Sequence, residues 1–416
     1  MEYKSDFLNE IYSRGFIYQS TDLFELDKLM KNKKISGYIG FDITSDSLHI
    51  GSLVPLMLLH WMDFYGHNSI ALIGGGTTLV GDPSGKDETR KILEVKEVEK
   101  NIINISNIFK KFIDLNKNAR MINNYEWLSK INYIKFIREI GSKLTINKML
   151  TFESVKNRLD REQPLTFLEF NYMLLQSYDF YYLNKQFDCI LQMGGSDQWG
   201  NIVSGIDLIR RISNKKAFAI TTPLITNSDG SKMGKTESGA IWLDEKKLSN
   251  YDFYQFWRNT EDSNVIKFLK FFTKLKINEI SKLSKLKGKE INEAKKILAF
   301  EVTKLVRGTK QANEAEEISK NIFTNNFLDQ RIKTFTINDK EILDSSFNII
   351  DTIEKLELVK TRSEIKRLIN SKGIKVNDNL YANKDYSLKN FISEKELKIS
   401  VGKKKIGILK INKTTN

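Results

Sequence analysis

The sequence predicts an α/β protein with a Rossmann-like parallel sheet, followed by an all-α region and a small α+β unit. Three observations predict it. Near-continuous apolar runs, typical of parallel strands covered on both faces, occur at 37–41, 69–73 and 187–193. A turn follows each run, polar over 42–47 and glycine-bearing after the other two, and apolar residues at helical spacing come after it. Helical patterns then dominate over 249–321, and short strand patterns close the chain.

The first strand, turn and helix lie in Tyr38–Pro55, YIGFDITSDSLHIGSLVP. The strand pattern covers Gly37–Phe41, and the helical spacing starts at Ile50. We expect His49 and Gly51 at the helix start, where unpaired N–H groups attract phosphate. A surface loop with a capping turn is the simpler alternative for this stretch.

The other elements follow in order. Two short helices are predicted over 3–31, a long amphipathic helix over 87–113, a strand over 119–123, and helices with connections over 131–160. A helix over 166–183, a strand over 187–193, a helix from Ile202 and a strand over 217–222 complete the α/β part. The turn GGGTTLVGDPSGK fails to match a P-loop, because Asp87 follows Gly85-Lys86. We expect its Asp82 at the pocket, although an Asx-turn before Pro83 is the alternative.

Composition narrows the class of protein. The 416 residues suit two or three domains, and the net charge of +14 favours a polyanionic partner such as nucleic acid. The single cysteine, Cys189, sits in an apolar run and excludes a disulfide network or a thiolate zinc cluster within the chain. An intracellular setting fits this usage. The sequence has neither a signal-peptide pattern nor an apolar run of about 18 residues, so we expect no membrane span.

Polar residues mark one face of the helix predicted over 166–183. Tyr172, Gln176 and Asp179 are spaced four and three apart, so they share that face. Such groups need partners if they are buried, and they suit an ammonium group and a phenol hydroxyl. An aromatic stripe that belongs only to the core is the alternative.

Two further turns carry chemistry. GGSDQWGN follows the strand over 187–193, where the carboxylate of Asp197 suits ribose hydroxyls and the glycines allow close approach. DGSKMGKT over 229–236 places Lys232 and Lys235 three apart, where ammonium groups can stabilise charge on leaving pyrophosphate. A basic surface loop is the alternative for the second turn.

With HIGS, GGSDQWGN and KMGKT in this order, the chain resembles class I aminoacyl-tRNA synthetases, and its wording is similar to the bacterial-type tyrosyl-tRNA synthetases. Ser52 departs from the HIGH motif, whose second His is expected there. The resemblance implies ATP-dependent activation of L-tyrosine and transfer of the tyrosyl group to tRNA-Tyr. It also implies Mg²⁺ accompanying ATP, no metal site of the protein's own, a homodimer and a cytoplasmic location.

The resemblance also assigns residues. It implies four catalytic donors: Thr44, His49, Lys232 and Lys235. Six residues are implied in tyrosine binding: Tyr38, Asp82, Tyr172, Gln176, Asp179 and Gln192. Twelve are implied in ATP binding: Gly40, Asp42, His49, Gly51, Ser52, Gly195, Asp197, Gln198, Lys232, Met233, Lys235 and Thr236.

Four segments are expected along the chain. Residues 1–225 form a Rossmann-like catalytic domain with a dimer-forming insertion, and 226–321 hold the lysine loop and a helical anticodon-binding domain. Residues 322–349 are a linker, and 350–416 form a small basic RNA-binding domain. Residues 351–416 hold about 16 Lys and Arg against about 8 acidic residues, roughly half of the net charge. A solvated basic tail is the alternative for this segment.

Three rival functions share these motifs. A tryptophanyl enzyme would have the same architecture, but Tyr38 with Asp179 favours a phenol. An RNA-binding or splicing factor derived from a synthetase, or an inactive regulatory paralogue, would not need intact nucleotide motifs. Pyrophosphate exchange that depends on tyrosine would separate all three.

Overall fold

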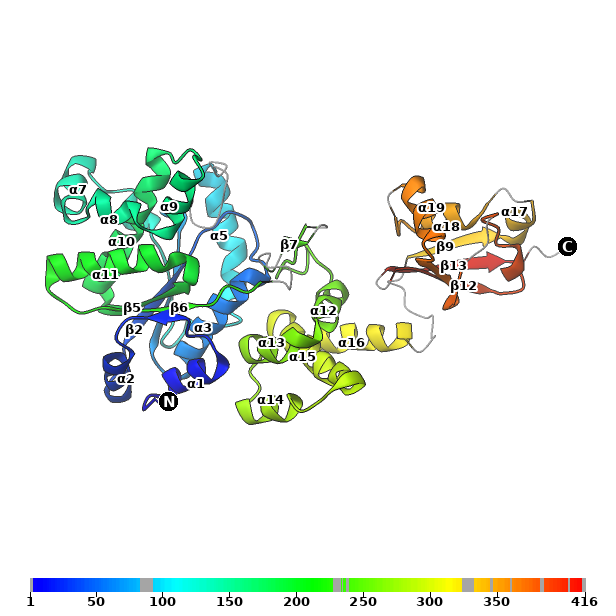
Figure 1. The fold of residues 1–416 in the computed structure, drawn as a ribbon, viewed down its shortest axis with the longest axis horizontal. Helices are drawn as coiled ribbons and strands as arrows, with labels where there is room; N and C mark the ends of the chain where they lie inside the picture. The colour runs from blue at the N-terminus through cyan, green and yellow to red at the C-terminus, as the bar shows by residue number, and fades with distance from the viewer. Residues whose placement is uncertain are drawn as a thin grey trace. The chain divides into compact units, whose positions relative to one another are not determined.

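The computed structural model describes residues 3–82, 93–226, 233, 235–236, 239–323, 333–344, 347–359, 361–381, 385–402 and 405–413. The chain divides into two compact units, Met1–Glu316 and Glu317–Asn416. Figure 1 shows the α/β sheet and the helices α12 to α15 in the first unit and a smaller sheet in the second. Among the described residues, no helix combines the length and the apolarity needed to cross a bilayer.

A six-stranded sheet organises the first unit. Its strand order is β1-β6-β5-β2-β3-β4, and every neighbouring pair is parallel except β1 with β6. Parallel order with helical crossovers confirms the predicted α/β class. The strands are β1 (Gln19–Ser20), β2 (Ser36–Phe41), β3 (Asn68–Ile73), β4 (Arg120–Asn123), β5 (Cys189–Gly195) and β6 (Phe218–Thr222).

Helices cover both faces of this sheet. Those of the α/β part are α1 (Asp6–Arg14), α2 (Leu23–Asn32), α3 (Leu53–Phe64), α4 (Gly75–Thr78), α5 (Val95–Phe109), α6 (Tyr125–Leu128), α7 (Tyr133–Glu139), α8 (Ile146–Leu150), α9 (Glu153–Asp160), α10 (Phe167–Phe187) and α11 (Trp199–Ser213). The helical region holds α12 (Asn250–Arg258), α13 (Val265–Phe272), α14 (Ile277–Leu283), α15 (Ile291–Arg307) and α16 (Thr309–Phe323).

Two predicted boundaries need correction. The helix expected over 87–113 is α5, which begins only at Val95, because the backbone of Glu94 is extended and 83–92 lie outside the described residues. The strand expected from Phe187 begins at Cys189. A capping box at Thr166 starts α10, and Asp188 in the left-handed region ends it, so Phe187 is the last helical residue.

Alternation along the strands decides which side chains face which helices. Tyr38, Ile70 and Leu72 share a cluster with Phe180 of α10 and Ile209 of α11. Their neighbours Ile39, Ala71 and Ile73 belong to the cluster on the opposite face, with α1 and α3. Tyr38 therefore points toward α10, and its ring lies 5.3 Å from that of Phe180.

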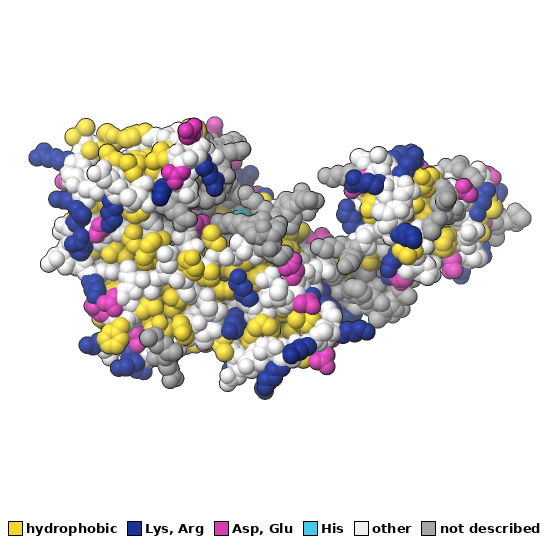
Figure 2. Space-filling model, viewed as in Figure 1, with side chains coloured by type: hydrophobic (Ala, Val, Ile, Leu, Met, Phe, Trp, Pro, Cys, Tyr) yellow, Lys and Arg dark blue, Asp and Glu magenta, His cyan; other side chains and the backbone are white. Residues whose placement is uncertain are grey.

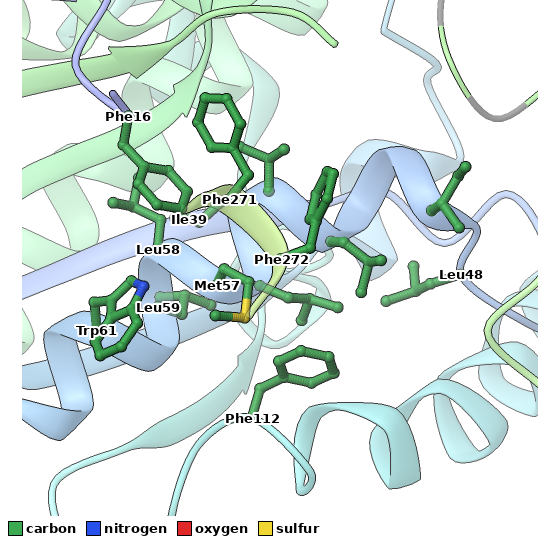
Figure 3. Close-up of a cluster of buried hydrophobic side chains, with 14 of the residues drawn as sticks. Phe16, Ile39, Leu48, Met57, Leu58, Leu59, Trp61, Phe112, Phe271 and Phe272 are labelled. Carbon is green, nitrogen blue, oxygen red and sulfur yellow. The ribbon is translucent and has the colours of Figure 1, made fainter. Parts of the chain in front are cut away.

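Helix α3 is covered on all sides. Nine of its twelve residues are buried, which is typical of a helix without a solvent face. Figure 3 shows Met57, Leu58, Leu59 and Trp61 in one cluster with Ile39 of β2 and with Phe271 and Phe272 of α13. The helical region thus shares one core with the sheet. The chain divides differently from the expected boundary at 225/226, because α13 packs directly on α3.

The second unit has its own five-stranded sheet, ordered β11-β10-β12-β13-β9. Its elements are β9 (Thr334–Asn338), α17 (Asp339–Leu343), α18 (Ile349–Lys355), α19 (Arg362–Asn370), β10 (Ile374–Val376), β11 (Asn379–Leu380), β12 (Glu396–Val401) and β13 (Lys405–Asn412). The expected linker over 322–349 therefore contains a strand and a helix. The polar composition of this segment predicted a linker, but its Ile337 is only 4% exposed and lies in β9, which pairs in parallel with β13.

Candidate active site

The HIGS turn begins the helix after β2, as predicted, but its N–H groups are not free. A short 3₁₀ turn, Ile50–Ser52, precedes α3. The N–H groups of Ile50, Gly51 and Ser52 donate to the Ile241 carbonyl, the His49 Nδ1 atom and the His49 carbonyl at 3.0, 3.0 and 2.8 Å. The expectation of unpaired N–H groups here is wrong, because a later segment and the His49 ring satisfy them. Since Nδ1 accepts, the neutral imidazole carries its proton on Nε2.

The segment after the lysine loop lies against this turn. Trp242 forms an antiparallel bridge with His49, and the Leu243 N–H donates to the Leu48 carbonyl at 2.8 Å. A β-carbon added at Gly51 would lie 3.7 Å from the Met233 carbonyl oxygen. The structure thus brings Met233 to the HIGS turn, as the predicted ATP-binding set requires.

A buried carboxylate network surrounds Asp179 on α10. Its two oxygens accept hydrogen bonds from Asn124 Nδ2 and Trp127 Nε1, both at 2.8 Å. Asp179 is 2% exposed, and burial raises its pKa to about 7, although the two donors oppose that rise and Asp42 adds to it. The same Asn124 also donates to Thr77 at 3.1 Å.

Two buried polar atoms next to this network have no hydrogen-bond partner among the described residues. They are the Tyr38 hydroxyl and the Gln192 Oε1 atom, on side chains only 1% and 2% exposed. Tyr38 and Gln192 pair directly across β2 and β5. Burial, and then the charge of Asp179, raise the pKa of Tyr38 well above its ordinary value. Buried polar groups are nearly always satisfied, so this pair indicates a place for a polar ligand group.

Asp42 joins the strand end to α10. Its carboxylate accepts from the Tyr172 hydroxyl and from the Thr77 hydroxyl, each at 3.0 Å. Sequence reasoning assigned Asp42 to ATP and Tyr172 to the tyrosine ammonium. The structure joins them through one hydrogen bond, so the two predicted subsites are adjacent.

A third group converges from three elements. Gln198 donates to Asp82 at 2.8 Å, and Asn201 donates to Gln176 at 2.9 Å and to Gln198 at 3.3 Å. Asp82 is 7% exposed, and it follows β3 and α4, whereas Gln198 follows β5. The segments that follow β3 and β5 thus meet across the end of β2, at the edge of a parallel sheet where ligand-binding turns gather.

The remaining predicted residues lie around these groups. A β-carbon at Gly40 would meet nothing within 4 Å, whereas one at Gly195 would lie 2.5 Å from the Asp197 Oδ1 atom. Gly40 therefore borders open space, and Gly195 allows the Asp197 carboxylate to fold back. Thr44 is exposed on the turn after β2, and Ser52 is half-buried at the start of α3.

Three predicted residues are not placed here. Lys232 lies outside the described residues. Lys235 and Thr236 form β7, which pairs antiparallel with β8 (Gly239–Ala240), but their side chains also lie outside the description. Their predicted roles at the phosphates stay predictions.

Sequence reasoning missed four residues that hold the site together: Thr77, Asn124, Trp127 and Asn201. Asn124 and Trp127 directly follow β4, the strand predicted over 119–123. Ligand-facing groups gather at the carboxyl ends of parallel strands, so their position alone was a usable signal.

No cluster of three or more His, Cys, Asp or Glu that could hold a metal exists within the described ranges. A groove of about 790 Å³ lies elsewhere, lined by His60, Asp63, Gly66 and residues 110–118. Gly66 and Asn118 precede β3 and β4, so this groove lies at the amino ends of the strands, opposite the site described above.

Comparisons with known proteins show the family of this chain. Residues 30–324 match the family described as tRNA synthetases class I (W and Y). A tyrosine–tRNA ligase from Pelagibacter ubique is 49% identical over 404 residues, which cover 96% of this chain and 98% of that protein. One from Rhodopseudomonas palustris is 48% identical over 415 residues, with 98% and 99% covered.

Solved structures show the same fold. A C-terminally truncated mitochondrial tyrosyl-tRNA synthetase from Aspergillus nidulans has a TM-score of 0.69 and 30% identity, covering 76% of this chain and 94% of that one. A tryptophanyl-tRNA synthetase from Encephalitozoon cuniculi shares the fold at a TM-score of 0.55 and 15% identity, covering 79% of this chain and 96% of that one.

Proposed function

This chain belongs to the class I tRNA synthetases of the W and Y family, and from that premise we infer that its site performs the reaction of a tyrosine–tRNA ligase. It activates tyrosine with ATP and transfers the tyrosyl group to tRNA-Tyr in translation. The tyrosine carboxylate attacks the α-phosphorus of ATP, and the bond to the leaving pyrophosphate breaks. A hydroxyl of the terminal tRNA ribose then attacks the tyrosyl carbonyl, and AMP leaves.

One observation supports tyrosine as the amino acid: the unpartnered Tyr38 hydroxyl beside the buried Asp179 carboxylate. A substrate phenol donating to Asp179 and accepting from Tyr38 would satisfy that hydroxyl. Gln192 lines the same space. Phenylalanine would leave these buried groups unpaired, and tyrosyl-tRNA synthetases are themselves the established example of such rejection, at a known ratio of about 10⁵ without editing.

The ammonium and carboxylate ends of tyrosine would lie toward the strand ends. We assign the ammonium to Tyr172, Gln176 and Asp82. The hydrogen-bond partners of Tyr172 and Asp82 are Asp42 and Gln198, which are both assigned to ATP. The two substrates would therefore meet between α10 and the turns after β2 and β5. Holding them in line supplies much of the rate, because no enzyme nucleophile is required.

ATP would lie over the HIGS turn. Gly40 leaves open space for the nucleotide, the missing side chains of Gly51 and Gly195 let His49 and Asp197 lie close to the backbone there, and Asp197 suits the ribose hydroxyls. We assign charge stabilisation on the triphosphate to Thr44, His49, Lys232 and Lys235, with Ser52 and Thr236 beside them and Met233 contributing backbone. Mg²⁺ would arrive as part of the ATP substrate and neutralise phosphate charge.

The other segments would serve tRNA. We assign anticodon contacts to α12–α16 and further RNA binding to the basic second unit, whose excess of Lys and Arg suits phosphate. Translation in bacterial relatives such as these takes place in the cytoplasm, and we place this activity there.

We also propose a homodimer through an apolar surface on α7–α10. Tyr133, Ile134, Ile146 and Phe167 are each at least 60% exposed there. Figure 2 shows hydrophobic side chains gathered over the region that Figure 1 labels α7 to α9. A contiguous exposed apolar surface of this kind is typical of a protein interface.

Tyrosine-dependent exchange of pyrophosphate into ATP tests the activity and its residues. We expect exchange with tyrosine and none above background with tryptophan. Lys235→Ala should lower kcat roughly 10²-fold with little change in tyrosine KM, since its ammonium acts on the leaving group. Lys216→Ala is the matched control, because this lysine pairs with Asp22 and Glu25 just before β6, at the end of that strand opposite the site. Equal effects of both variants would contradict the assignment.

The dimer has its own test. Ile134→Lys should convert the dimer to a monomer in light scattering coupled to gel filtration, because a buried lysine at the interface is costly. Phe24→Lys is the control: Phe24 is 80% exposed on α2, outside this surface. A wild-type monomer at micromolar concentration would contradict the proposal.

A further inference from the structure

Arg307, the last residue of α15, is a buried cation outside the predicted site. Its side chain is 7% exposed, and its Nη2 atom donates to the carbonyl oxygens of Trp242 at 3.0 Å and Leu248 at 3.2 Å. Its guanidinium carbon lies 4.8 Å from the centre of the Phe253 ring. A buried guanidinium stays charged only with such acceptors, because an uncompensated interior charge is costly. Arg307 therefore joins both ends of the segment 242–248 to the end of α15 by hydrogen bonds.

That segment is the one paired with the HIGS turn. Trp242, whose carbonyl accepts from Arg307, bridges to His49, and the two rings lie 6.4 Å apart edge to face. The flanking residues complete the pairing through the Ile50 and Leu243 N–H groups. The backbone of Trp242 thus contacts the Arg307 guanidinium through its carbonyl and pairs with His49 through the bridge.

A second contact holds the same segment from the other side. Lys247 Nζ lies 4.8 Å from the centre of the Trp242 ring and 2.5 Å from the Asp46 carboxylate, on the turn before HIGS. This ion pair is partly exposed, with 31% and 42% of the two side chains accessible, so it contributes little by itself. The buried contacts of Arg307 are therefore the stronger restraint on Trp242.

Arginine suits this position better than lysine. Both hydrogen bonds come from one nitrogen, Nη2, so the advantage of arginine is its delocalised, weakly hydrated charge, which costs less to bury beside the Phe253 ring than a strongly hydrated ammonium. Burial lowers the pKa of Arg307 to about 10, opposed by Glu245 and Asp244, so the side chain remains charged at neutral pH. Lys111 provides a comparison: its Nζ donates to the Val306 carbonyl at 2.7 Å on the same helix end, and among the described residues it donates no hydrogen bond to Trp242 or Leu248, although its charge interacts with Asp244 and Glu245.

We propose that Arg307 is a positioning residue for tyrosine activation, which locks Trp242–Leu248 against Leu48–Ile50 and thereby fixes the His49 imidazole. The proposal rests on the role proposed above for His49 toward the triphosphate. Since α15 belongs to the helical region assigned to tRNA, Arg307 also links that region physically to the reaction site.

Kinetics of tyrosine-dependent pyrophosphate exchange test this link. Arg307→Met should lower kcat at least about tenfold while the tyrosine KM stays within about twofold, because the tyrosine pocket lies on other elements. Arg307→Lys should recover part of the loss, since an ammonium can still donate to one carbonyl. Lys111→Met should keep kcat within about twofold and controls for the loss of a buried cation at this helix end.

A double-mutant cycle separates positioning from general destabilisation. If Arg307 acts through His49, Arg307→Met combined with His49→Ala should be no more than about twofold slower than His49→Ala alone. If the double variant instead loses kcat by the product of the two single losses, the proposal is overturned. A normal kcat in Arg307→Met would also overturn it when His49→Ala is slow. A normal kcat in His49→Ala would instead refute the role of His49 itself. Should Arg307→Met fail to fold, the same cycle is run with Arg307→Lys.

Discussion

Asp179→Asn separates two effects of the buried carboxylate. Its charge destabilises the folded protein, and it binds the phenol hydroxyl of tyrosine. Wild-type Asp179 has a pKa of about 7, raised by burial from the ordinary 3.8. The contribution of the protonated Asp179 carboxyl to the free energy of unfolding is therefore fully present below about pH 4, and it is lost as the pH rises through 7. The difference of about three units corresponds to at most about 4 kcal/mol.

The asparagine variant has no charge to bury, so its stability relative to wild type should rise between pH 5 and pH 8. One cost opposes this gain. Asn124 and Trp127 both donate to Asp179, and the amide of an asparagine can accept from only one of them. A lost buried hydrogen bond costs about 1–3 kcal/mol, so near pH 7.5 the asparagine variant should be more stable than wild type by at most about 1–3 kcal/mol. Urea denaturation at several pH values measures both effects.

Recognition of tyrosine should suffer much more than stability. The phenol loses a charge-assisted hydrogen bond of about 1.5–3 kcal/mol, so tyrosine KM in pyrophosphate exchange should rise roughly 10- to 150-fold. Phenylalanine has no hydroxyl, so its KM should change by less than about threefold. The wild-type tyrosine KM should also fall up to about tenfold from pH 6 to pH 8, as the carboxylate forms, and that of the variant should stay flat. Equal changes for both amino acids would refute the reasoning.

Three further predictions concern Tyr38, Asn124 and the second unit. Tyr38→Phe removes a buried hydroxyl that has no partner in the described structure, so stability to urea should hold or rise by about 1 kcal/mol while tyrosine KM rises roughly tenfold; a loss of stability with normal KM would contradict its role. Asn124→Ala removes a donor that lowers the pKa of Asp179, so the midpoint of the pH dependence of tyrosine KM should move upward from about 7; an unchanged midpoint would exclude the contact. Removing 324–416 should spare pyrophosphate exchange and weaken tRNA charging, with a shallower dependence on salt. Removing only 350–416 should reduce solubility, because β9 and Ile337 lose their partners β13 and Ile411; equal solubility of the two truncations would contradict this.

Local signals were sufficient for the catalytic scaffold. The apolar runs, each followed by a turn and a helical pattern, predicted β2, β3 and β5, because a strand buried on both faces has no polar positions. The spacing of Tyr172, Gln176 and Asp179 placed them on one helical face, and all three accept or donate hydrogen bonds within the site. By contrast, the linker prediction failed at β9. There the strand owes its stability to pairing with β13, about 70 residues later, which local composition does not report.

The sequence alone determined the order of strands, turns and helices and the side chains at each strand end. Only the tertiary structure decided how those side chains pair: Asn124 and Trp127 on Asp179, Thr77 on Asp42, and Arg307 on Trp242. The physical reason is that alternation and helical spacing are properties of neighbouring residues. A hydrogen bond between buried groups instead depends on where the sheet and its helices place distant parts of the chain.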